Sequence, residues 1–388
     1  MKAEIISIGT EILLGQILNT NQQWLSQELA GIGIGVYFHS TIGDNPGRLA
    51  NAIKTGLERS DIVITTGGLG PTVDDITLET IASALSLGLK LDKRQAHIPE
   101  GAKVIDNGIG TAPGFIVDKG GKLLIALPGP PRELNPMFER TVAPLLKKRY
   151  GSEGILKIRT IRMTGLGEEA VDRRVKDLLK CPPPLTVGIY AKPALIELKI
   201  MAKAKDDKQA KALIDKADAK ITARLGKYIF GRDNETLEGA VGSGLLRSRR
   251  TLAVAESCTG GLIASRITDV PGSSKYFRLG IVAYSNAAKI KFLGVCPGTL
   301  AKFGAVSRQT AIEMAKNVRM AACADIGLSV TGIAGPSGAT KDKPVGLVYI
   351  ALAGKNKSYC REFRFRGERE VIKFRTSQAA LDLLRVSL

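Results

Sequence analysis

The amino-acid sequence predicts an α/β protein in which two α/β domains are bridged by a small α+β module. Short apolar runs alternate with helix-period segments over residues 1–150, and the same alternation returns over residues 236–388. Residues 151–235 change character, with strand and helix segments around a break at Cys181-Pro182-Pro183-Pro184. A chain of 388 residues also exceeds the size that one hydrophobic core usually supports. We therefore expect three domains with these boundaries.

The alternation in residues 1–150 predicts right-handed βαβ units, which form a mostly parallel sheet between two layers of helices. The expected strands are Ile5–Ile8, Val36–Phe38, Ile62–Thr65 and Leu123–Leu127. The expected helices are Asn21–Ala30, Pro46–Glu58 and Ile76–Leu85. In such sheets ligands bind at the carboxyl ends of the strands, where the glycine-rich segments of this domain fall.

The same patterns assign elements to the other two domains. In residues 151–235 we expect strands Ile155–Met163, Val187–Tyr190 and Leu195–Met201, and helices Glu168–Leu179 and Asp207–Leu225. In residues 236–388 the expected strands are Thr251–Ala255, Gly280–Tyr284, Ile326–Val330, Val345–Ala353 and Ser358–Phe365. The expected helices are Leu237–Leu246, Gly261–Thr268, Ala287–Leu293, Arg308–Ala322 and a final one that starts near Glu370. This domain is therefore a second three-layer α/β domain.

Composition is that of an ordinary globular protein, with 44% hydrophobic and 24% charged residues. No apolar run approaches the roughly 20 residues that cross a bilayer. The beginning, MKAEIISIGTE, has the pattern of a buried strand and lacks the basic front and the small-residue cleavage site of a signal peptide. We therefore expect a cytoplasmic protein that has no membrane partner.

Cysteine and histidine usage argues against several kinds of site. The five cysteines contain no C-x-x-C pair, which argues against a disulfide framework and against a zinc cluster. The two histidines, His39 and His97, lie outside the glycine-rich segments. A Ser-His-Asp triad or a multi-histidine metal site is therefore not expected. Any general base must be a lysine, a tyrosine or a carboxylate.

The formal net charge of +19 indicates anionic partners. Lysine and arginine are spread along the chain, and aromatic residues make up only 5% of it, so stacking platforms for single-stranded nucleic acid are scarce. Phosphate-bearing small molecules are therefore the preferred partners. Nucleic acid stays open as an alternative, and its binding would weaken steeply with salt.

A polar turn follows the expected strand Thr251–Ala255. It consists of Glu256-Ser257-Cys258-Thr259-Gly260-Gly261 and leads into a helix. The backbone N–H groups of such a turn bind an anion or an oxyanion, and a serine at the strand end exposes a nucleophilic hydroxyl. The alternative is that Ser257 and Thr259 only cap the helix.

Two more strand ends in this domain carry polar groups. One leads into Tyr284-Ser285-Asn286, with Lys289 one helical turn later, and the other into the glycine-rich segment Thr331–Gly338. Three such ends predict a pocket, in which a partly desolvated Lys289 would lose its charge and act as the base for Ser257. Tyr284 would relay the proton or bind the leaving amide nitrogen. The alternative for Lys289 is a surface residue that holds phosphate.

These segments together resemble the C-terminal domain of the CinA family (competence/damage-inducible protein A). The resemblance is carried, in order, by AESCTGG, DVPGSS, YSNAAKIKFLGV, GAVS, TGIAGPSG and KPVGLVYIALA. It implies an amidase that converts nicotinamide mononucleotide to nicotinate mononucleotide and ammonia without a cofactor. By the same resemblance Ser257 is the nucleophile, and Tyr284 and Lys289 belong to the catalytic group. The substrate-binding residues that it implies are Thr259, Gly260, Gly261, Asn286, Thr331, Gly332, Gly335 and Gly338.

Cys258 is the rival nucleophile, because thiolates attack carbonyl groups well. It lies one residue after Ser257 and would point away from the pocket if Ser257 faces it. We therefore expect the serine, and not the cysteine, to carry the reaction.

Glycine-rich segments also follow the expected strands of residues 1–150. The predicted phosphate-binding residues are Gly67, Gly68, Gly70 and Thr72, since glycines let backbone amides approach a phosphate. The predicted ligands of a divalent metal ion beside it are Asp74, Asp75 and Glu133. Asp75 has an alternative role as the N-cap of helix Ile76–Leu85, and Pro131 and Glu133 also suit a helix start.

The segments GTEILLGQ, GGLGPTVDD and LPGPPREL resemble the molybdopterin-binding-type domain that forms the N-terminal half of CinA proteins. The resemblance implies a metal-dependent pyrophosphatase that cleaves ADP-ribose to AMP and ribose 5-phosphate. The alternative is a domain that binds a nucleotide or a pterin without chemistry. This chain departs from the family at the junction Leu91–Gln95, where a longer, partly helical stretch is usual, and at Val73, where a polar residue is common.

Residues 151–235 resemble the KH-type insert of the same family. They lack a G-x-x-G loop flanked by basic residues, and Gly165-Leu166-Gly167 matches it only in part, so RNA binding is not the preferred role. A structural spacer that helps the chain form a homodimer is preferred. A nucleic-acid-binding competence factor is the competing hypothesis, which the charge of +19 supports.

Overall fold

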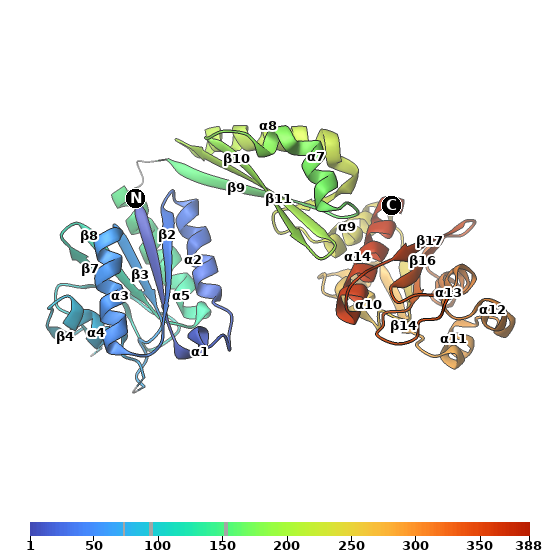
Figure 1. Cartoon of the computed structure of the whole chain (residues 1–388), viewed down its shortest axis with the longest axis horizontal. Coiled ribbons are helices and arrows are strands. Elements are labelled where there is room, and N and C mark those ends of the chain that lie inside the picture. The colour runs from blue at the N-terminus through green and yellow to red at the C-terminus, as the bar shows by residue number, and fades with distance from the viewer. Residues whose placement is uncertain (73, 93–95, 151–153) are drawn as a thin grey trace. The chain divides into compact units, whose positions relative to one another are not determined.

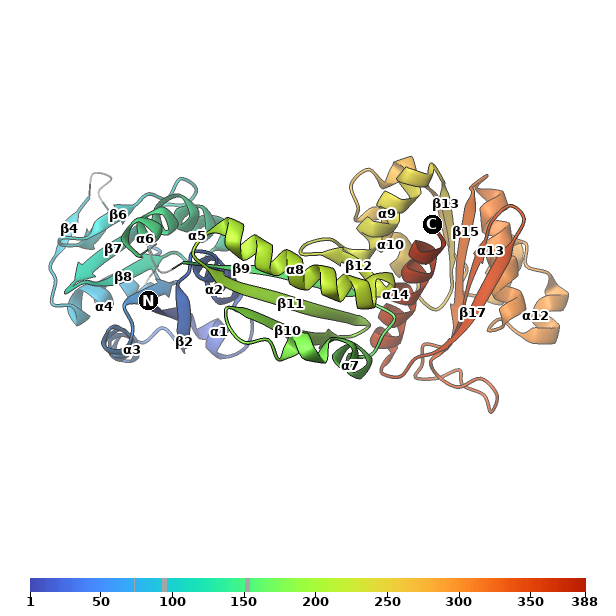
Figure 2. The ribbon, with the colours of Figure 1, turned by 90° about the horizontal axis from the view of Figure 1, so that it is seen from above.

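The computed structural model describes residues 1–72, 74–92, 96–150 and 154–388. The chain forms two compact units. The first contains Met1–Ile158, Pro183–Leu185 and Met201–Ile214, and the second contains Arg159–Pro182, Thr186–Ile200 and Asp215–Leu388. In the described residues the sheets have six, four and five strands, beside a two-stranded hairpin, and helices accompany the three larger sheets (Figures 1 and 2). The predicted α/β class is confirmed.

The six-stranded sheet has the order β2-β1-β3-β8-β7-β6. Its strands are β1 (Lys2–Ile8), β2 (Gly35–Ile42), β3 (Ile62–Thr66), β6 (Lys103–Ile105), β7 (Gly114–Lys119) and β8 (Lys122–Leu127). β2, β1, β3 and β8 pair in parallel, whereas β7 and β6 add antiparallel strands at one side. The carboxyl ends of four strands therefore lie at the same edge of this sheet.

Helices cover both faces of this sheet (Figure 1). They are α1 (Thr10–Leu13), α2 (Thr20–Gly31), α3 (Pro46–Arg59), α4 (Thr77–Ala84), α5 (Pro131–Met137) and α6 (Ala143–Tyr150). Successive residues of β3 pack in the hydrophobic cores on opposite faces of the sheet. Ile64 belongs to the core that includes Leu25 of α2, and Val63 belongs to the core that includes Ile53 of α3. This alternation is what the period of two along a strand requires, and it gives the three predicted layers.

A short antiparallel hairpin contains β4 (Leu89–Leu91) and β5 (His97–Pro99). The junction Leu91–Gln95 falls here. Its residues Lys93–Gln95 lie outside the described residues, and so does Val73.

The four-stranded sheet is formed by the middle of the chain, in the order β10-β11-β9-β12. Its strands are β9 (Ile155–Met163), β10 (Leu185–Lys192), β11 (Leu195–Ala204) and β12 (Ile229–Arg232), and its helices are α7 (Glu168–Leu179) and α8 (Asp207–Leu225). β9, α7 and α8 begin and end at the predicted residues.

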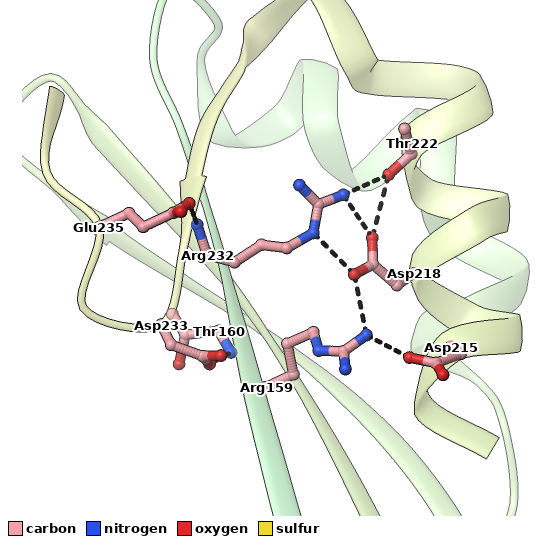
Figure 3. Close-up of polar contacts among 8 residues, drawn as sticks. All are labelled: Arg159, Thr160, Asp215, Asp218, Thr222, Arg232, Asp233 and Glu235. Carbon is pink, nitrogen blue, oxygen red and sulfur yellow. Dashed lines mark hydrogen bonds and ion pairs between the residues drawn. The ribbon is translucent and has the colours of Figure 1, made fainter. Parts of the chain in front are cut away.

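A buried carboxylate on α8 joins this helix to two strands (Figure 3). Asp218 is 6% exposed and accepts hydrogen bonds of 2.8 Å from both Nε and Nη2 of Arg232, and one of 3.1 Å from Arg159. Burial raises the pKa of the Asp218 carboxyl, but the hydrogen bonds from Arg232 and Thr222 lower it further than burial raises it. The carboxylate is therefore ionised at neutral pH and stabilises the packing of α8.

The five-stranded sheet of residues 236–388 has the order β14-β13-β15-β16-β17. Its strands are β13 (Leu252–Glu256), β14 (Phe277–Val282), β15 (Ile326–Gly332), β16 (Leu347–Ala353) and β17 (Ser358–Arg364). β14, β13 and β15 are parallel, and β16 and β17 continue the sheet antiparallel. The sheet is therefore mixed, with its three parallel strands at one side.

Both faces of this sheet are covered as well (Figure 2). The helices are α9 (Leu237–Ser248), α10 (Leu262–Thr268), α11 (Asn286–Leu293), α12 (Pro297–Phe303), α13 (Arg308–Ala321) and α14 (Arg369–Ser387). α9, α10 and α14 pack on one face, where Val254 and Leu328 point. α13 packs on the other, where small residues allow close approach: a Cβ on Gly327 would lie 2.0 Å from the carbonyl oxygen of Ala315.

Two findings complete the comparison with the sequence. The prediction omitted the strands β4, β5, β6, β7 and β12, the helices α1 and α6, and also α12, a helix with proline in its first turn. Within the described ranges, no helix combines the length and the apolar character that crossing a membrane requires.

Asp218→Asn tests the polar network of Figure 3. The substitution keeps the shape of the side chain but removes the charge, and both arginines are partly exposed, so we expect α8 to lose about 1–2 kcal/mol of local stability at pH 7. Because the pKa of Asp218 is lowered in the folded state, the stabilisation is present above the ordinary carboxyl pKa of 3.8 and is lost as the pH falls through the lowered value. Hydrogen exchange of the α8 amides, followed by mass spectrometry, measures both effects.

Asp215→Asn is the matched control, because Asp215 lies on the same helix, is half exposed and, among the residues that the structure describes, forms an ion pair with Arg159 alone. Its effect on exchange should be smaller. Equal effects of the two substitutions would contradict the role given to Asp218.

Candidate active site

Three strand ends meet at one edge of the five-stranded sheet, as the sequence predicted. The N–H of Ser257 donates to the carbonyl of Val330 at 3.0 Å, and the N–H of Ala283 donates to the carbonyl of Glu256 at 2.9 Å. The main chain thus connects the end of β13 to the segments at the ends of β15 and β14. Ser257 lies between these two segments and is 8% exposed.

The turn after β13 is capped by a residue that the sequence analysis did not select. The Glu256 carboxylate accepts hydrogen bonds from the N–H groups of Gly261 (3.1 Å), Ile263 (3.1 Å) and Ala264 (2.8 Å). Ser257 and Thr259 make no such capping bond, so the alternative that they only cap α10 is wrong. The Ser257 hydroxyl is therefore free for another contact.

That contact is with Lys289 on α11. Lys289 Nζ lies 3.0 Å from Ser257 Oγ and donates to the carbonyl oxygens of Ala283 (2.9 Å) and Tyr284 (3.2 Å). The Lys289 side chain is 1% exposed, and no carboxylate in the described part of the chain forms an ion pair with it. The alternative of a surface lysine is wrong, because Lys289 is buried.

The surroundings of Lys289 favour its neutral form. Burial lowers the pKa of the Lys289 ammonium below its ordinary value of 10.5. A neutral amine has two N–H groups and one lone pair, and the two carbonyl oxygens accept both N–H groups. In the structure Nζ also donates to Ser257 Oγ at 3.0 Å, so three oxygens surround the amine. After Nζ loses a proton, a lone pair that faces Ser257 Oγ can accept the hydroxyl proton, as a general base requires.

Tyr284 contributes its main chain and not its phenol to this pair. Its side chain is 59% exposed, and the phenolic oxygen accepts a hydrogen bond of 2.8 Å from Arg369 Nη2. Arg369 also donates to the carbonyl of Gly335 at 2.6 Å. No motif in the sequence indicated Arg369, which the start of α14 brings here. The predicted proton relay through the Tyr284 phenol has no hydrogen bond to support it in the described residues.

Cys258 points away from Ser257. Its side chain is 5% exposed and belongs to the hydrophobic cluster beneath α10 and α14. Burial raises the pKa of the Cys258 thiol to about 12, so the thiolate that attacks carbonyl groups is scarce at neutral pH.

The predicted binding residues of this domain fall into two groups. Gly260 and Gly261 have φ values of 64° and 96°, which glycine adopts without strain, and they form the turn itself. Thr259 is fully buried, and its hydroxyl has no partner among the described residues. The remaining residues lie in the segments at the ends of β14 and β15. Asn286, at the first position of α11, and Gly338 are exposed. The Thr331 hydroxyl donates to the carbonyl of Ala305, Gly332 packs on Val348, and the carbonyl of Gly335 accepts from Arg369.

A second candidate site lies at the carboxyl ends of β1, β3 and β8. A cleft of about 740 Å³ is lined by the segments that follow these strands. Gly67, Gly68 and Gly70 line it, whereas Thr72 does not. The N–H of Gly67 already donates to Leu127 at 3.1 Å, so this amide is not available to a phosphate.

The three predicted metal ligands line the same cleft but do not form one group. Asp74 and Asp75 both accept a hydrogen bond from the Thr72 hydroxyl, whereas Glu133 accepts one of 2.9 Å from Asn107. Asp75 also accepts from the N–H of Thr72, and α4 has no side-chain cap, so the alternative of Asp75 as a helix cap is wrong. In the described ranges no three His, Cys, Asp or Glu side chains converge as a metal site.

The residues of this cleft fit a metal site with two carboxylate ligands better than one with three. Mg²⁺ commonly uses one or two carboxylates, and the phosphates of its substrate supply other ligands. Asp74 and Asp75 meet that requirement without Glu133. Asn107, which no motif in the sequence indicated, donates to Glu133 instead. α5 begins at Pro131, as the alternative for this segment predicted.

Three family profiles match the chain in succession. Residues 4–148 match a probable molybdopterin binding domain, residues 158–231 match the damage-inducible protein CinA KH domain, and residues 234–388 match the CinA C-terminal domain. The order of the three matches is the order of the predicted domains.

Whole-length relatives give the same result. A competence-damage inducible protein of Caldicellulosiruptor saccharolyticus is 48% identical over 410 aligned positions, which cover 100% of this chain and 99% of the relative. A CinA-like protein of Kosmotoga olearia is 46% identical over 410 positions, with the same coverage. Because the chain has 388 residues, these alignments include positions at which the relatives carry residues that this chain lacks.

Among solved structures, the competence/damage inducible protein CihA from Agrobacterium tumefaciens is 41% identical, covering 38% of this chain and 91% of that one, with a TM-score of 0.38. Identity along the full length and the three successive domain matches are sufficient for assignment. The chain belongs to the CinA family of competence/damage-inducible proteins.

Proposed function

We propose that the C-terminal domain is an amidase that hydrolyses nicotinamide mononucleotide to nicotinate mononucleotide and ammonia. The observation that carries the proposal is the buried pair of Ser257 Oγ and Lys289 Nζ, 3.0 Å apart. An uncharged amine beside a serine hydroxyl is the arrangement that activates a nucleophile for attack on an amide. The choice of substrate follows from the likeness of the surrounding motifs to the CinA deamidase domain.

The proposed reaction has two steps. In the first, Ser257 Oγ attacks the carboxamide carbon and Lys289 Nζ takes its proton. The C–N bond then breaks, and Lys289 returns the proton to the leaving nitrogen, so that ammonia departs and an ester joins Ser257 to the nicotinoyl group. In the second step, Lys289 deprotonates a water molecule that attacks this ester. The C–O bond to Ser257 then breaks, and Lys289 returns the proton to Ser257 Oγ as the acid leaves.

The turn after β13 supplies groups for the developing negative charge. Its own hydrogen bonds use the N–H groups of Ser257, Gly260 and Gly261. The Thr259 N–H is not used in this way, and the buried Thr259 hydroxyl has no partner among the described residues. In this proposal the Thr259 N–H stabilises the oxyanion of the tetrahedral intermediate.

Ser257→Ala is expected to lower ammonia release from nicotinamide mononucleotide by about 10⁴-fold or more, because the nucleophile is lost. Cys258→Ala is the matched control, since it alters the neighbouring residue, whose side chain lies in the core. It should keep the rate within about twofold of wild type once the protein is folded. Loss of activity in Cys258→Ala with retention in Ser257→Ala would contradict the assignment.

The pH dependence tests the base. Because Lys289 acts in its neutral form, kcat/KM should rise with pH as Lys289 loses its proton. The midpoint of this rise should lie below pH 10.5, and kcat/KM should reach a plateau above it. Lys289→Arg should abolish activity at every pH, because a guanidinium stays charged. A kcat/KM that does not change with pH, measured with substrate well below KM and with stable protein, would exclude Lys289 as the base.

For the N-terminal domain we propose binding and hydrolysis of a diphosphate such as ADP-ribose. The observation that favours it is the cleft of about 740 Å³, a volume in the range of small-molecule sites, with Asp74 and Asp75 in its lining. These two residues would hold a divalent ion, which would neutralise the charge of the diphosphate. Binding of a nucleotide or a pterin without hydrolysis is the alternative.

Asp75→Asn tests this second proposal. It keeps a hydrogen-bond acceptor for the Thr72 N–H but removes the charge, so formation of AMP from ADP-ribose with added Mg²⁺ should fall at least about tenfold. Glu79→Ala, on the exposed side of α4, should leave the rate unchanged. Equal rates in Asp75→Asn and wild type would contradict the role of Asp75. Binding of ADP-ribose without product, measured by calorimetry, would support the binding-only alternative.

A further inference from the structure

Glu256 is a buried carboxylate that the proposed reaction does not use. It is the last residue of β13, lies directly before Ser257 and is 1% exposed. Its Oε2 accepts from the N–H groups of Gly261 and Ile263, and its Oε1 accepts from that of Ala264. In the described part of the chain, no lysine or arginine forms an ion pair with it. Three backbone N–H groups are therefore its hydrogen-bond partners.

Glu256 is also held through its main chain. Its carbonyl accepts the N–H of Ala283, and the carbonyl of that same Ala283 accepts from Lys289 Nζ at 2.9 Å. The next residue, Ser257, donates its N–H to Val330. Glu256 thus connects the position of the Ser257 turn on one side with the position of the Lys289 amine on the other.

The turn between these anchors contains two glycines in the left-handed region, Gly260 and Gly261. Within the turn the Gly260 N–H donates to the Ser257 carbonyl at 3.1 Å. Glycine has more conformational freedom than any other residue, so this backbone bond alone holds the far end of the turn weakly. The side chain of Glu256 closes it, because one carboxylate binds the N–H groups at its far end. A small displacement of a nucleophile is costly, since a shift of 1 Å lowers a rate by about 10²-fold.

We propose that Glu256 is a positioning residue: its carboxylate clamps the turn Ser257–Gly261 so that Ser257 Oγ stays within hydrogen-bonding distance of Lys289 Nζ. The inference rests on the proposed roles of Ser257 and Lys289. It has a second consequence, because the Gly261, Ile263 and Ala264 N–H groups are occupied by the protein itself. The phosphate of the substrate is therefore bound elsewhere, and not at these amides.

Glu256→Ala with added acetate tests the proposal. The substitution removes the atoms beyond Cβ, and acetate contains the same carboxylate and one carbon. In the folded variant we expect kcat for ammonia release to fall about 10²-fold while KM stays within about twofold. Acetate should then raise kcat with saturation, whereas sodium chloride at equal ionic strength should not. An unchanged kcat in the variant would overturn the proposal, and so would a lowered kcat that acetate does not raise.

Glu313→Ala is the matched control. Glu313 also binds groups at the start of a helix of this domain, with its carboxylate accepting from the Cys296 N–H at 2.9 Å and the Thr299 hydroxyl at 2.6 Å. Its removal should lower the melting temperature without an acetate-dependent change in kcat. Acetate-dependent recovery in Glu313→Ala would show that the effect is general and would overturn the positioning role.

Two further measurements keep the test decisive. If Glu256→Ala does not fold, Glu256→Gln replaces it, because glutamine keeps the shape of the side chain. Its kcat should be lower than that of wild type while KM is unchanged. An unchanged kcat would overturn the proposal. Labelling of Ser257 by a fluorophosphonate, followed by intact mass, reports its nucleophilicity without nicotinamide mononucleotide. The clamp is supported if Glu256→Ala is labelled more slowly than wild type and acetate restores the wild-type labelling rate. This result would support the clamp even if the wild type released no ammonia, and then only the substrate assignment would fail.

Discussion

The chemistry proposed for the C-terminal domain depends on one constraint, the burial of the Lys289 amine without a carboxylate partner among the described residues. Charged ammonium groups are expensive to bury unless they are paired, so burial lowers the pKa of the Lys289 ammonium. The carbonyl oxygens of Ala283 and Tyr284 accept N–H groups of the amine, and Ser257 Oγ, 3.0 Å from Nζ, is the neighbour whose proton the neutral amine would accept. Parallel pairing of β13 with β14 and β15 brings these groups to one edge.

Much of the fold was predictable from the sequence, because hydrophobic periodicity reports which face of each element is buried. β9, α7 and α8 were predicted to the residue, and Pro131 begins α5 as expected. Eight elements of the described part of the chain were missed: α1, β4, β5, β6, β7, α6, β12 and α12. Most of them are short, and α12 is a short helix directly after Cys296 with one buried side chain, Leu300. The homodimer and the cofactor expectations stay predictions.

The candidate site was predictable only in part. Ser257 and Lys289 were selected because they follow strand ends, and parallel strands place such ends together. Glu256, Arg369 and Asn107 were not, because their roles come from contacts between segments distant in the chain or from a choice of rotamer that no local pattern encodes. In the same way, Glu133 satisfied the chemistry of a metal ligand but is hydrogen-bonded to Asn107, away from Asp74 and Asp75.

The most direct test of the central claim is the ionisation of Lys289 itself. NMR of the full-length chain labelled with ¹⁵N-lysine, with the signal assigned through Lys289→Arg, would follow its Nζ through a pH titration. The account predicts that Lys289 loses its proton at a lower pH than the exposed lysines, clearly below 10.5. A Lys289 that titrates together with the exposed lysines would be charged at neutral pH, and the Ser257–Lys289 pair would then have no base.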